Sequence, residues 1–227
     1  ISKSPSAPPA ERRDANVLYF GQNMATTENH EFVAAYGHDR VRVTPISETA
    51  EIGMAIGAAM AGYRPVIELY MAEFMLVAMD QVVNEAPRFR YMSGGQVKLP
   101  LVMKAGYGFT AGWAGQHTGS LTAMFMGTPG LKVVVPSTPS DAKGLMATAI
   151  RDDNPVVYLH HYMLTLEHGE VPDGEHLVPF GKAAVRRAGE HQQEARLVVR
   201  HQRRRETLRV VLGDEAGVEL PGDELRV

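Results

Sequence analysis

The 227-residue chain contains no cysteine, a single tryptophan and a formal net charge of only −3. The lack of thiols excludes a disulfide framework, thiolate metal sites and a cysteine nucleophile. The small net charge gives no general reason to expect nucleic acid or a membrane surface as a partner. No apolar run approaches membrane length, and no apolar signal core precedes Asn16, so we expect a soluble cytoplasmic protein.

Residues 44–62, TPISETAEIGMAIGAAMAG, predict a helix. Ser47 suits the N-cap, and Glu48 and Glu51 lie in the first turn, where the helix dipole stabilises carboxylates. Residues 52–61 carry no polar side chain, so we predict a helix with no solvent face. Small residues recur in this helix at spacings of three and four and would let another backbone approach closely. One option is a contact across subunits. The small residues are Ala50, Gly53, Gly57 and Ala61.

Strands alternate with helices along the rest of the chain. The predicted strands are residues 17–20, 41–43, 66–70, 99–106, 131–136 and 155–160, with helices at 48–61, 74–92, 121–126 and 141–153. We predict a loop with one helical turn between Gly21 and His38, and a glycine-rich loop at residues 106–119. The alternation predicts an α/β fold of three layers, with helices on both faces of a mostly parallel sheet. Ligands of such sheets bind beyond the carboxyl ends of the strands.

Composition divides the chain into three parts. Residues 1–15 contain three prolines and little apolar content, which predicts a loose arm. Residues 16–182 carry the α/β pattern and form the expected domain. Residues 183–227 form an atypical tail, with eight arginines between Arg186 and Arg209 and then five acids between Asp214 and Glu224. Because the tail has neither interleaved aromatic residues nor a known motif, we do not expect it to bind nucleic acid.

A series of longer segments resembles one known family. The segments are TPISE, GAAMAGYRPVIE, AMDQVVNEA, RYMSGGQ, LPLV, GQH, PGLKVVVPSTPSDAKGLM and AIRDDNPVV. In order and spacing they resemble the β chain of the decarboxylating component of 2-oxoacid dehydrogenase complexes, of the pyruvate and acetoin type. Glu48, followed by Gly53, Met54 and Gly57, is also similar to the signature of the pyrimidine-binding domain of thiamine-diphosphate enzymes. The resemblance leads us to expect that this tail stands in place of a second α/β domain, which members of the family normally have.

The resemblance implies that Glu48 is catalytic. In the family, the matching glutamate hydrogen-bonds a ring nitrogen of the aminopyrimidine and so lets the cofactor remove its own thiazolium proton. The apolar helix behind Glu48 suits a carboxyl that keeps a proton, because burial disfavours the charged form. Judged from its position alone, Glu48 is a helix-start carboxylate stabilised by the dipole. Phe74 matches a phenylalanine that stacks on the pyrimidine, although an aromatic at a helix start is often simple core.

Gln116 and His117 lie in the glycine-rich loop. A lone histidine is usually structural, but an imidazole there could move protons or orient a carboxylate near neutral pH. The resemblance implies that His117 serves substrate binding and acyl transfer to lipoamide, and that Gln116 lies at the cofactor pocket. His160 and His161 match no common zinc-binding spacing and are interpreted as strand-end residues.

The resemblance also implies cations and partners. The family's potassium ligands would map to the carbonyls of Leu101, Ala149 and Asn154 and to the Asp152 carboxylate, although aspartates also form turns. The family's acidic residue after the first strand is Gln22 or Asn23 here.

Two-chain enzymes of this type hold magnesium and the diphosphate through a Gly-Asp-Gly segment, which this sequence lacks. The resemblance therefore implies that an α subunit supplies the magnesium-diphosphate half of the thiamine diphosphate site. The assembly would be of the α2β2 type and would pass acyl groups to a lipoyl acyltransferase core. Two alternatives remain: a non-catalytic or degenerate binding subunit, and a split transketolase-like enzyme.

Overall fold

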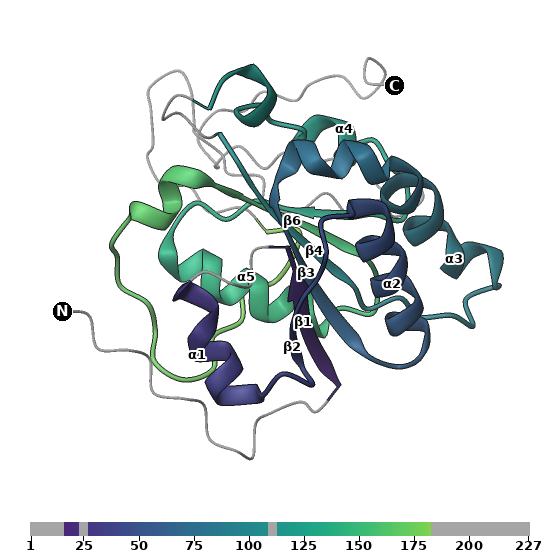
Figure 1. The fold of residues 1–227 in the computed structure, drawn as a ribbon, viewed down its shortest axis with the longest axis horizontal. Helices are drawn as coiled ribbons and strands as arrows, with labels where there is room; N and C mark the ends of the chain where they lie inside the picture. The colour runs from purple at the N-terminus through teal and green to yellow at the C-terminus, as the bar shows by residue number, and fades with distance from the viewer. Residues whose placement is uncertain (1–15, 23–26, 109–112, 183–227) are drawn as a thin grey trace, which may run out of the picture.

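The structure, a computed structural model, describes residues 16–22, 27–108 and 113–182, so the predicted arm and tail lie outside the described residues. Six strands form one sheet in the order β2-β1-β3-β4-β6-β5, and each pairing is parallel (Figure 1). The strands are β1 (Val17–Gly21), β2 (Val41–Val43), β3 (Arg64–Met71), β4 (Val102–Tyr107), β5 (Lys132–Val134) and β6 (Val156–His161). The predicted strands are thus confirmed, with shifted ends.

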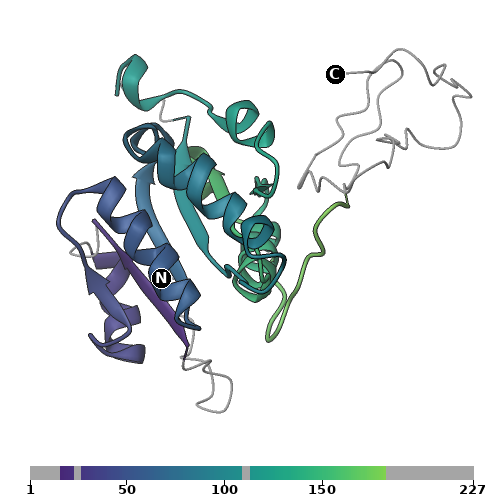
Figure 2. The same ribbon diagram turned by 90° about the vertical axis from the view of Figure 1, so that its right-hand side faces the viewer.

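Alternating side chains of the strands form two cores, one on each face of the sheet. Ile67, Met103 and Leu159 belong to one core, and their sequence neighbours Val66, Val102 and Tyr158 belong to the other. This division follows from the period of two in a strand. The helices are α1 (Thr27–Tyr36), α2 (Glu48–Met60), α3 (Ala86–Met92), α4 (Thr122–Met126) and α5 (Pro139–Arg151). Side chains of α2, α3 and α4 pack into the first core, and α1 and α5 lie on the second face (Figures 1 and 2). The predicted three-layer α/β fold is confirmed.

The prediction of a loop with one helical turn between Gly21 and His38 was wrong in the length of the helix, because α1 occupies ten of these residues. Aromatic contacts of Phe32 connect the helix to β1. Phe32 lies 5.5 Å from the Tyr19 ring and 6.3 Å from the Tyr36 ring, measured between centroids. Phe32 nevertheless stays 46% exposed. The sequence of the helix, TENHEFVAAY, shows no strong apolar period. Gly37, with φ of +77°, ends the helix in the left-handed conformation that glycine tolerates.

The predicted helix at residues 74–92 begins earlier and changes its winding. The segment Ala72–Ala78 is a 3₁₀ helix, Asp80–Glu85 is a π-helical turn, and α3 follows. Pro87 has no N–H to donate to the preceding turn, which explains why the regular α-helical ladder starts only at this point. The short helix α4 and the helix α5 lie where the sequence predicts them.

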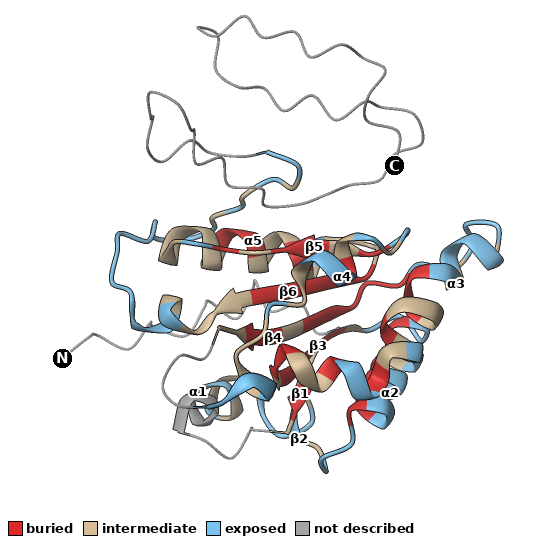
Figure 3. Cartoon of the chain, turned by 90° about the horizontal axis from the view of Figure 1, so that it is seen from above, coloured by how far each residue is buried: buried red, intermediate tan, exposed pale blue. Residues whose placement is uncertain are grey.

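Helix α2 matches its prediction in position but not in its surroundings. Ile52, Ala55, Ile56 and Ala59 are buried against the sheet. The other side of the helix is exposed (Figure 3), so the prediction of a helix with no solvent face was wrong for the described residues. The exposed residues are Ala50, Gly53, Met54, Gly57 and Met60. Ser47 occupies the N-cap, yet its side chain makes no capping hydrogen bond. No helix in the described part of the chain is long and apolar enough to cross a membrane.

Candidate active site

The candidate site lies at the carboxyl edge of the sheet, where β1, β2 and β3 are neighbours. Gln22 follows β1, Thr44 follows β2, and Glu73 and Phe74 follow β3. Close strand contact at this edge requires Gly21, since a Cβ atom there would lie 2.3 Å from the Glu68 carbonyl oxygen. Parallel strands therefore bring these side chains together from distant parts of the sequence.

Glu48 is the first residue of α2 and is buried, with 9% exposure. The Gln22 amide donates a hydrogen bond of 2.9 Å to its Oε1 atom. Thr49, the next residue, donates to the Val77 carbonyl at 3.1 Å and so ties the start of α2 to the 3₁₀ helix that contains Phe74. The carboxyl of Glu48 is thus held at the carboxyl edge of the sheet, and its role in binding a cofactor stays a prediction.

Glu51 is a second carboxyl at this edge, and it is only 2% exposed. Thr44 Oγ1 donates to its Oε1 atom at 2.8 Å, and Gln22 Nε2 donates to its Oε2 atom at 3.2 Å. Burial raises the pKa of the Glu51 carboxyl, the hydrogen bonds from Thr44, Ser47 and Gln22 oppose that rise, and the neighbouring charge of Glu48 adds to it. The arrangement therefore combines two buried carboxyls with donors that are all uncharged.

Phe74 and His117 come together although they are far apart in sequence. Their ring centroids lie 5.7 Å apart in an edge-to-face geometry, and Trp113 lies 6.3 Å from His117. The main chain is strained shortly before each of these two residues, with φ of 60° at Tyr70 before Phe74 and at Ala114 before His117. Such conformations cost on the order of 1–3 kcal/mol and concentrate at functional sites. Gln116, the remaining predicted residue of this loop, is exposed.

Glu73 fixes the loop that contains His117. Its Oε1 atom accepts a hydrogen bond from the Gly119 N–H, and its Oε2 atom is buried with no hydrogen-bond partner among the described residues. Sequence reasoning missed Glu73, Glu51 and Thr44 as parts of this edge. The only available signal for Glu51 was an acid in the first turn, next to the apolar run of α2, but its burial depends on the tertiary contacts with Gln22 and Thr44.

His160 and His161 end β6, as predicted. Burial, with a smaller effect of the Lys104 charge, lowers the pKa of His160 to about 3, so its imidazole is neutral near pH 7. His160 lines a hollow of about 830 Å³ between α1 and α5, with Lys104 and Tyr19. This hollow lies on the face opposite α2 and includes none of the predicted site residues.

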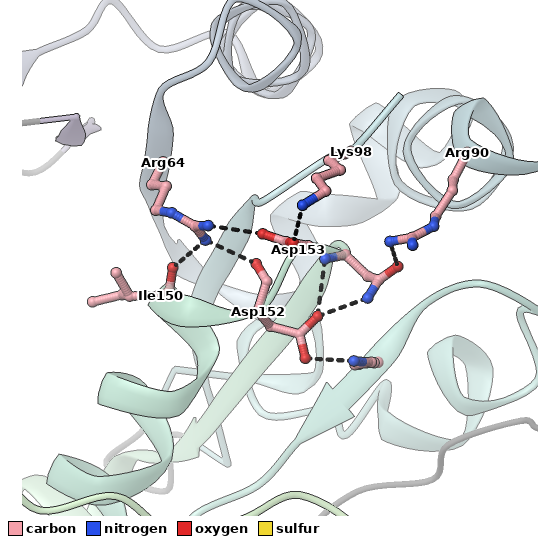
Figure 4. Close-up of polar contacts among 8 residues, drawn as sticks. Arg64, Arg90, Lys98, Ile150, Asp152 and Asp153 are labelled. Atoms are coloured by element: carbon pink, nitrogen blue, oxygen red, sulfur yellow. Dashed lines mark hydrogen bonds and ion pairs between the residues drawn. The ribbon is translucent and has the colours of Figure 1, made fainter. Parts of the chain in front are cut away.

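The predicted potassium ligands precede β4 and β6, at the amino edge of the sheet, whereas Glu48 follows β2 at the carboxyl edge. Figure 4 shows Asp152 and the polar contacts around it. The Asp152 carboxylate pairs with Lys132 and accepts from the Asn154 main-chain N–H at 2.9 Å and from its side-chain amide at 2.8 Å. The Leu101 carbonyl accepts from the Val156 N–H at 2.8 Å, and the Ala149 carbonyl accepts from the Asp152 N–H at 3.2 Å. Each carbonyl keeps a second lone pair. The described residues contain no cluster of three or more histidine or acidic side chains able to hold a metal ion.

Residues 10–165 match the family described as the transketolase pyrimidine-binding domain. The chain belongs to this family. The β subunit of an acetoin:2,6-dichlorophenolindophenol oxidoreductase from Cupriavidus necator is 50% identical over 153 residues, which are 66% of this chain and 45% of the relative. The pyruvate dehydrogenase E1 component subunit beta of Rickettsia conorii is 42% identical over 78% of this chain and 56% of the relative.

A 2-oxoisovalerate dehydrogenase subunit beta from Bacillus subtilis is 40% identical, with the same shares covered as for the Rickettsia protein. The chain thus spans about half the length of these curated relatives. Among solved structures, a split-gene transketolase described as an inactive β4 tetramer shares the fold, with a TM-score of 0.60 at 18% identity over 76% of this chain and 52% of that one. This last likeness concerns the fold alone.

Proposed function

We propose that this chain is the pyrimidine-binding β component of a thiamine-diphosphate-dependent dehydrogenase that acts on a pyruvate-like 2-oxoacid or on acetoin. The observation that carries the proposal is the buried carboxyl of Glu48, held by Gln22 on the same sheet edge as Phe74 and His117. Membership of the pyrimidine-binding family and the similarity to β subunits with these activities support it.

The residues at this edge suit an aminopyrimidine ring. A buried carboxyl can keep or accept a proton opposite a ring nitrogen, and the partly buried Phe74 offers an aromatic face for stacking. When bound, thiamine diphosphate supplies the electron sink for cleaving a bond next to a carbonyl group. Glu48 would hold the proton at the ring nitrogen, while Gln116 would line the pocket. His117 would orient the substrate or move a proton during acyl transfer to lipoamide.

The magnesium and diphosphate half of the site would come from an α subunit. The exposed side of α2 is the proposed contact with that subunit or with a second copy of this chain. A Cβ atom added to Gly53 or Gly57 meets nothing within 4 Å, so another backbone has room to approach. An apolar surface of this kind is unfavourable in water and is covered in an α2β2-type assembly, on which a lipoyl acyltransferase core would dock.

Size changes at Gly57 test this contact. Gly57→Leu should block assembly with the α partner, and Gly57→Ala should do so much less. In the isolated chain, both changes should raise the free energy of unfolding by up to about 1 kcal/mol, because glycine is a poor helix former. Sedimentation of the mixed chains and denaturant unfolding of the single chain measure the two effects. Normal assembly of the leucine variant would place the contact elsewhere.

Calorimetry with thiamine diphosphate and magnesium tests the two-chain site. Charge-assisted contacts to the diphosphate normally supply much of the binding, so this chain alone should bind weakly and the mixture with an α partner tightly. Tight, magnesium-dependent binding by the single chain would contradict the proposal. Product analysis of the mixed enzyme with pyruvate, acetoin and sugar phosphates then distinguishes the dehydrogenases from a transketolase-like enzyme, and no turnover at all indicates a degenerate subunit.

We also propose a potassium ion at the amino edge, bound by the carbonyls of Leu101, Ala149 and Asn154 and by Asp152. The second lone pairs of these carbonyls and the irregular turn after α5 support the site. The Lys132 ammonium already neutralises Asp152, so the ion would bind chiefly through main-chain oxygens.

A further inference from the structure

Glu51 is buried at a place where an apolar residue would avoid the penalty of burying a carboxyl. It lies one turn after Glu48 on α2, between side chains that follow β1 and β2. Burial of an acid without a cation raises its pKa and costs stability when the acid ionises. The described residues contain no ion pair to Glu48 or Glu51. An ion pair therefore does not explain why the carboxyl of Glu51 is buried at this position.

The Gln22 amide connects the two carboxyls. Its Nε2 atom lies 2.9 Å from Glu48 Oε1 and 3.2 Å from Glu51 Oε2. A primary amide has two N–H groups, so one is available to each carboxyl. Thr44 Oγ1 fixes the other oxygen of Glu51 at 2.8 Å. If Gln22 turned, it would lose at least one of these hydrogen bonds, and the chain of contacts from Thr44 to Glu48 would be broken.

We propose that Glu51 is a positioning residue for Glu48 and acts through the shared amide of Gln22. The inference deepens the proposed function and rests on it, since the benefit of a fixed Glu48 carboxyl is its alignment with the cofactor ring. Positioned hydrogen bonds contribute to catalysis because the reacting groups need no rearrangement at the moment of reaction. Glu51 itself touches neither substrate nor cofactor in this scheme.

The groups that face Glu51 define its response to pH. Glu48 is the titratable neighbour on its own helix, while Gln22 after β1 and Thr44 after β2 do not titrate. Because the pKa of Glu51 is raised in the folded state, its contribution to stability is present below its ordinary value of 4.5 and is lost as the pH rises through the folded value. Glu51→Gln removes this loss, so the variant should gain stability relative to the wild type as the pH rises.

A double-mutant cycle in the reconstituted two-chain enzyme tests the connection. Glu51→Met should lower kcat by about tenfold, the equivalent of about 1.4 kcal/mol, with a smaller change in the KM for the substrate. Gln22→Met should have a similar effect, and the double variant should be no worse than Gln22→Met alone, because both changes break the same connection. Glu51→Gln keeps a carbonyl oxygen and should recover part of the activity. Glu175→Met, at an exposed acid outside the site, is the matched control.

The results separate the two proposals. Near-normal activity of Glu48→Gln would overturn the proposed function. If Glu48→Gln loses activity, two results would overturn only the positioning role of Glu51. One is unchanged activity in Glu51→Met, and the other is additive effects of Gln22→Met and Glu51→Met. Unfolding of the full chain without cofactor, measured between pH 4 and 8, gives a readout that is independent of turnover. There the difference in unfolding free energy between Glu51→Gln and the wild type should change with pH, and a constant difference would also contradict the inference.

Discussion

Acidic side chains occur at both edges of the sheet, and their partners differ. At the carboxyl edge, Glu48 and Glu51 receive hydrogen bonds from an amide and a hydroxyl. At the amino edge, Asp152 pairs with Lys132, and Asp153 pairs with Lys98 and Arg64 (Figure 4). The two edges belong to the same sheet, so the comparison concerns the side chains rather than the fold.

The difference in partners gives opposite proton affinities. The hydrogen bonds from Lys98 and then Arg64 lower the pKa of Asp153, whereas burial raises the pKa of Glu51. A carboxyl with cationic partners stays ionised and holds elements together. A buried carboxyl with neutral donors can carry a proton at a pH closer to neutrality, which is the property that acid–base chemistry requires. The contrast teaches that ion pairs keep Asp153 ionised at the amino edge, whereas burial among neutral donors favours the protonated form of Glu51 at the carboxyl edge.

The largest effect is expected for Glu48→Gln, which keeps the shape of the side chain but removes the carboxyl. We expect the turnover of the reconstituted enzyme to fall by roughly 10²–10⁴-fold, the range for a positioned proton-transfer group, with the fold intact. Steady-state kinetics and circular dichroism measure the two properties. Turnover close to that of the wild type would break the comparison, because the carboxyl edge would then have no special role.

His117→Ala should have a smaller and more selective effect. The change removes the imidazole that lies 5.7 Å from the Phe74 ring. Lipoamide-linked activity should fall by about 100-fold, whereas decarboxylation with an artificial electron acceptor should fall much less, since the proposed role is in acyl transfer. The ratio of the two assays is the measurement. Equal losses would indicate a structural or substrate-binding role for this histidine.

Asp153→Asn should act on stability and leave the chemistry unchanged. Both ion pairs are partly exposed, so the expected loss of unfolding free energy at pH 7 is no more than about 1 kcal/mol. Because the pKa of Asp153 is lowered from 3.8, its contribution is present above that value and is lost as the pH falls through the folded pKa. Urea unfolding at pH 7 and in acid should show the difference shrinking in acid, the reverse of the trend with Glu51→Gln. A difference that persists in acid would contradict the ion-pair explanation.

The smallest expected effect is that of potassium. Replacing sodium by potassium at equal ionic strength should raise the unfolding free energy by about 0.4 kcal/mol when the potassium concentration equals the dissociation constant of the proposed potassium site. Asp152→Asn should reduce this gain, and Asp153→Asn should leave it unchanged. Thermal unfolding in the two salts measures it. Equal stability of the wild type in sodium and potassium would show that the amino edge needs only its lysines and arginines.

Sequence patterns by themselves predicted the six strands, the start of α2 and the three-layer fold. These features depend on local periodicity, which repeats every two residues in a strand and every 3.6 residues in a helix. The resemblance also placed Glu48, Phe74 and His117 in the site, and the structure brings Phe74 and His117 into contact. Helix α1 escaped prediction because aromatic contacts with β1 hold it, and those contacts are not visible as an apolar period.

The tertiary structure alone decided the connection between Gln22, Glu48 and Glu51. Gln22 and Glu48 are 26 positions apart, and they meet because β1 and β2 are neighbours and α2 begins above their ends. Likewise, the sequence predicts an apolar α2 but not that the described chain covers only one side of it. Local pattern determines which elements form, whereas the order of the strands and the packing of the helices determine which side chains meet and which surface is left for a partner.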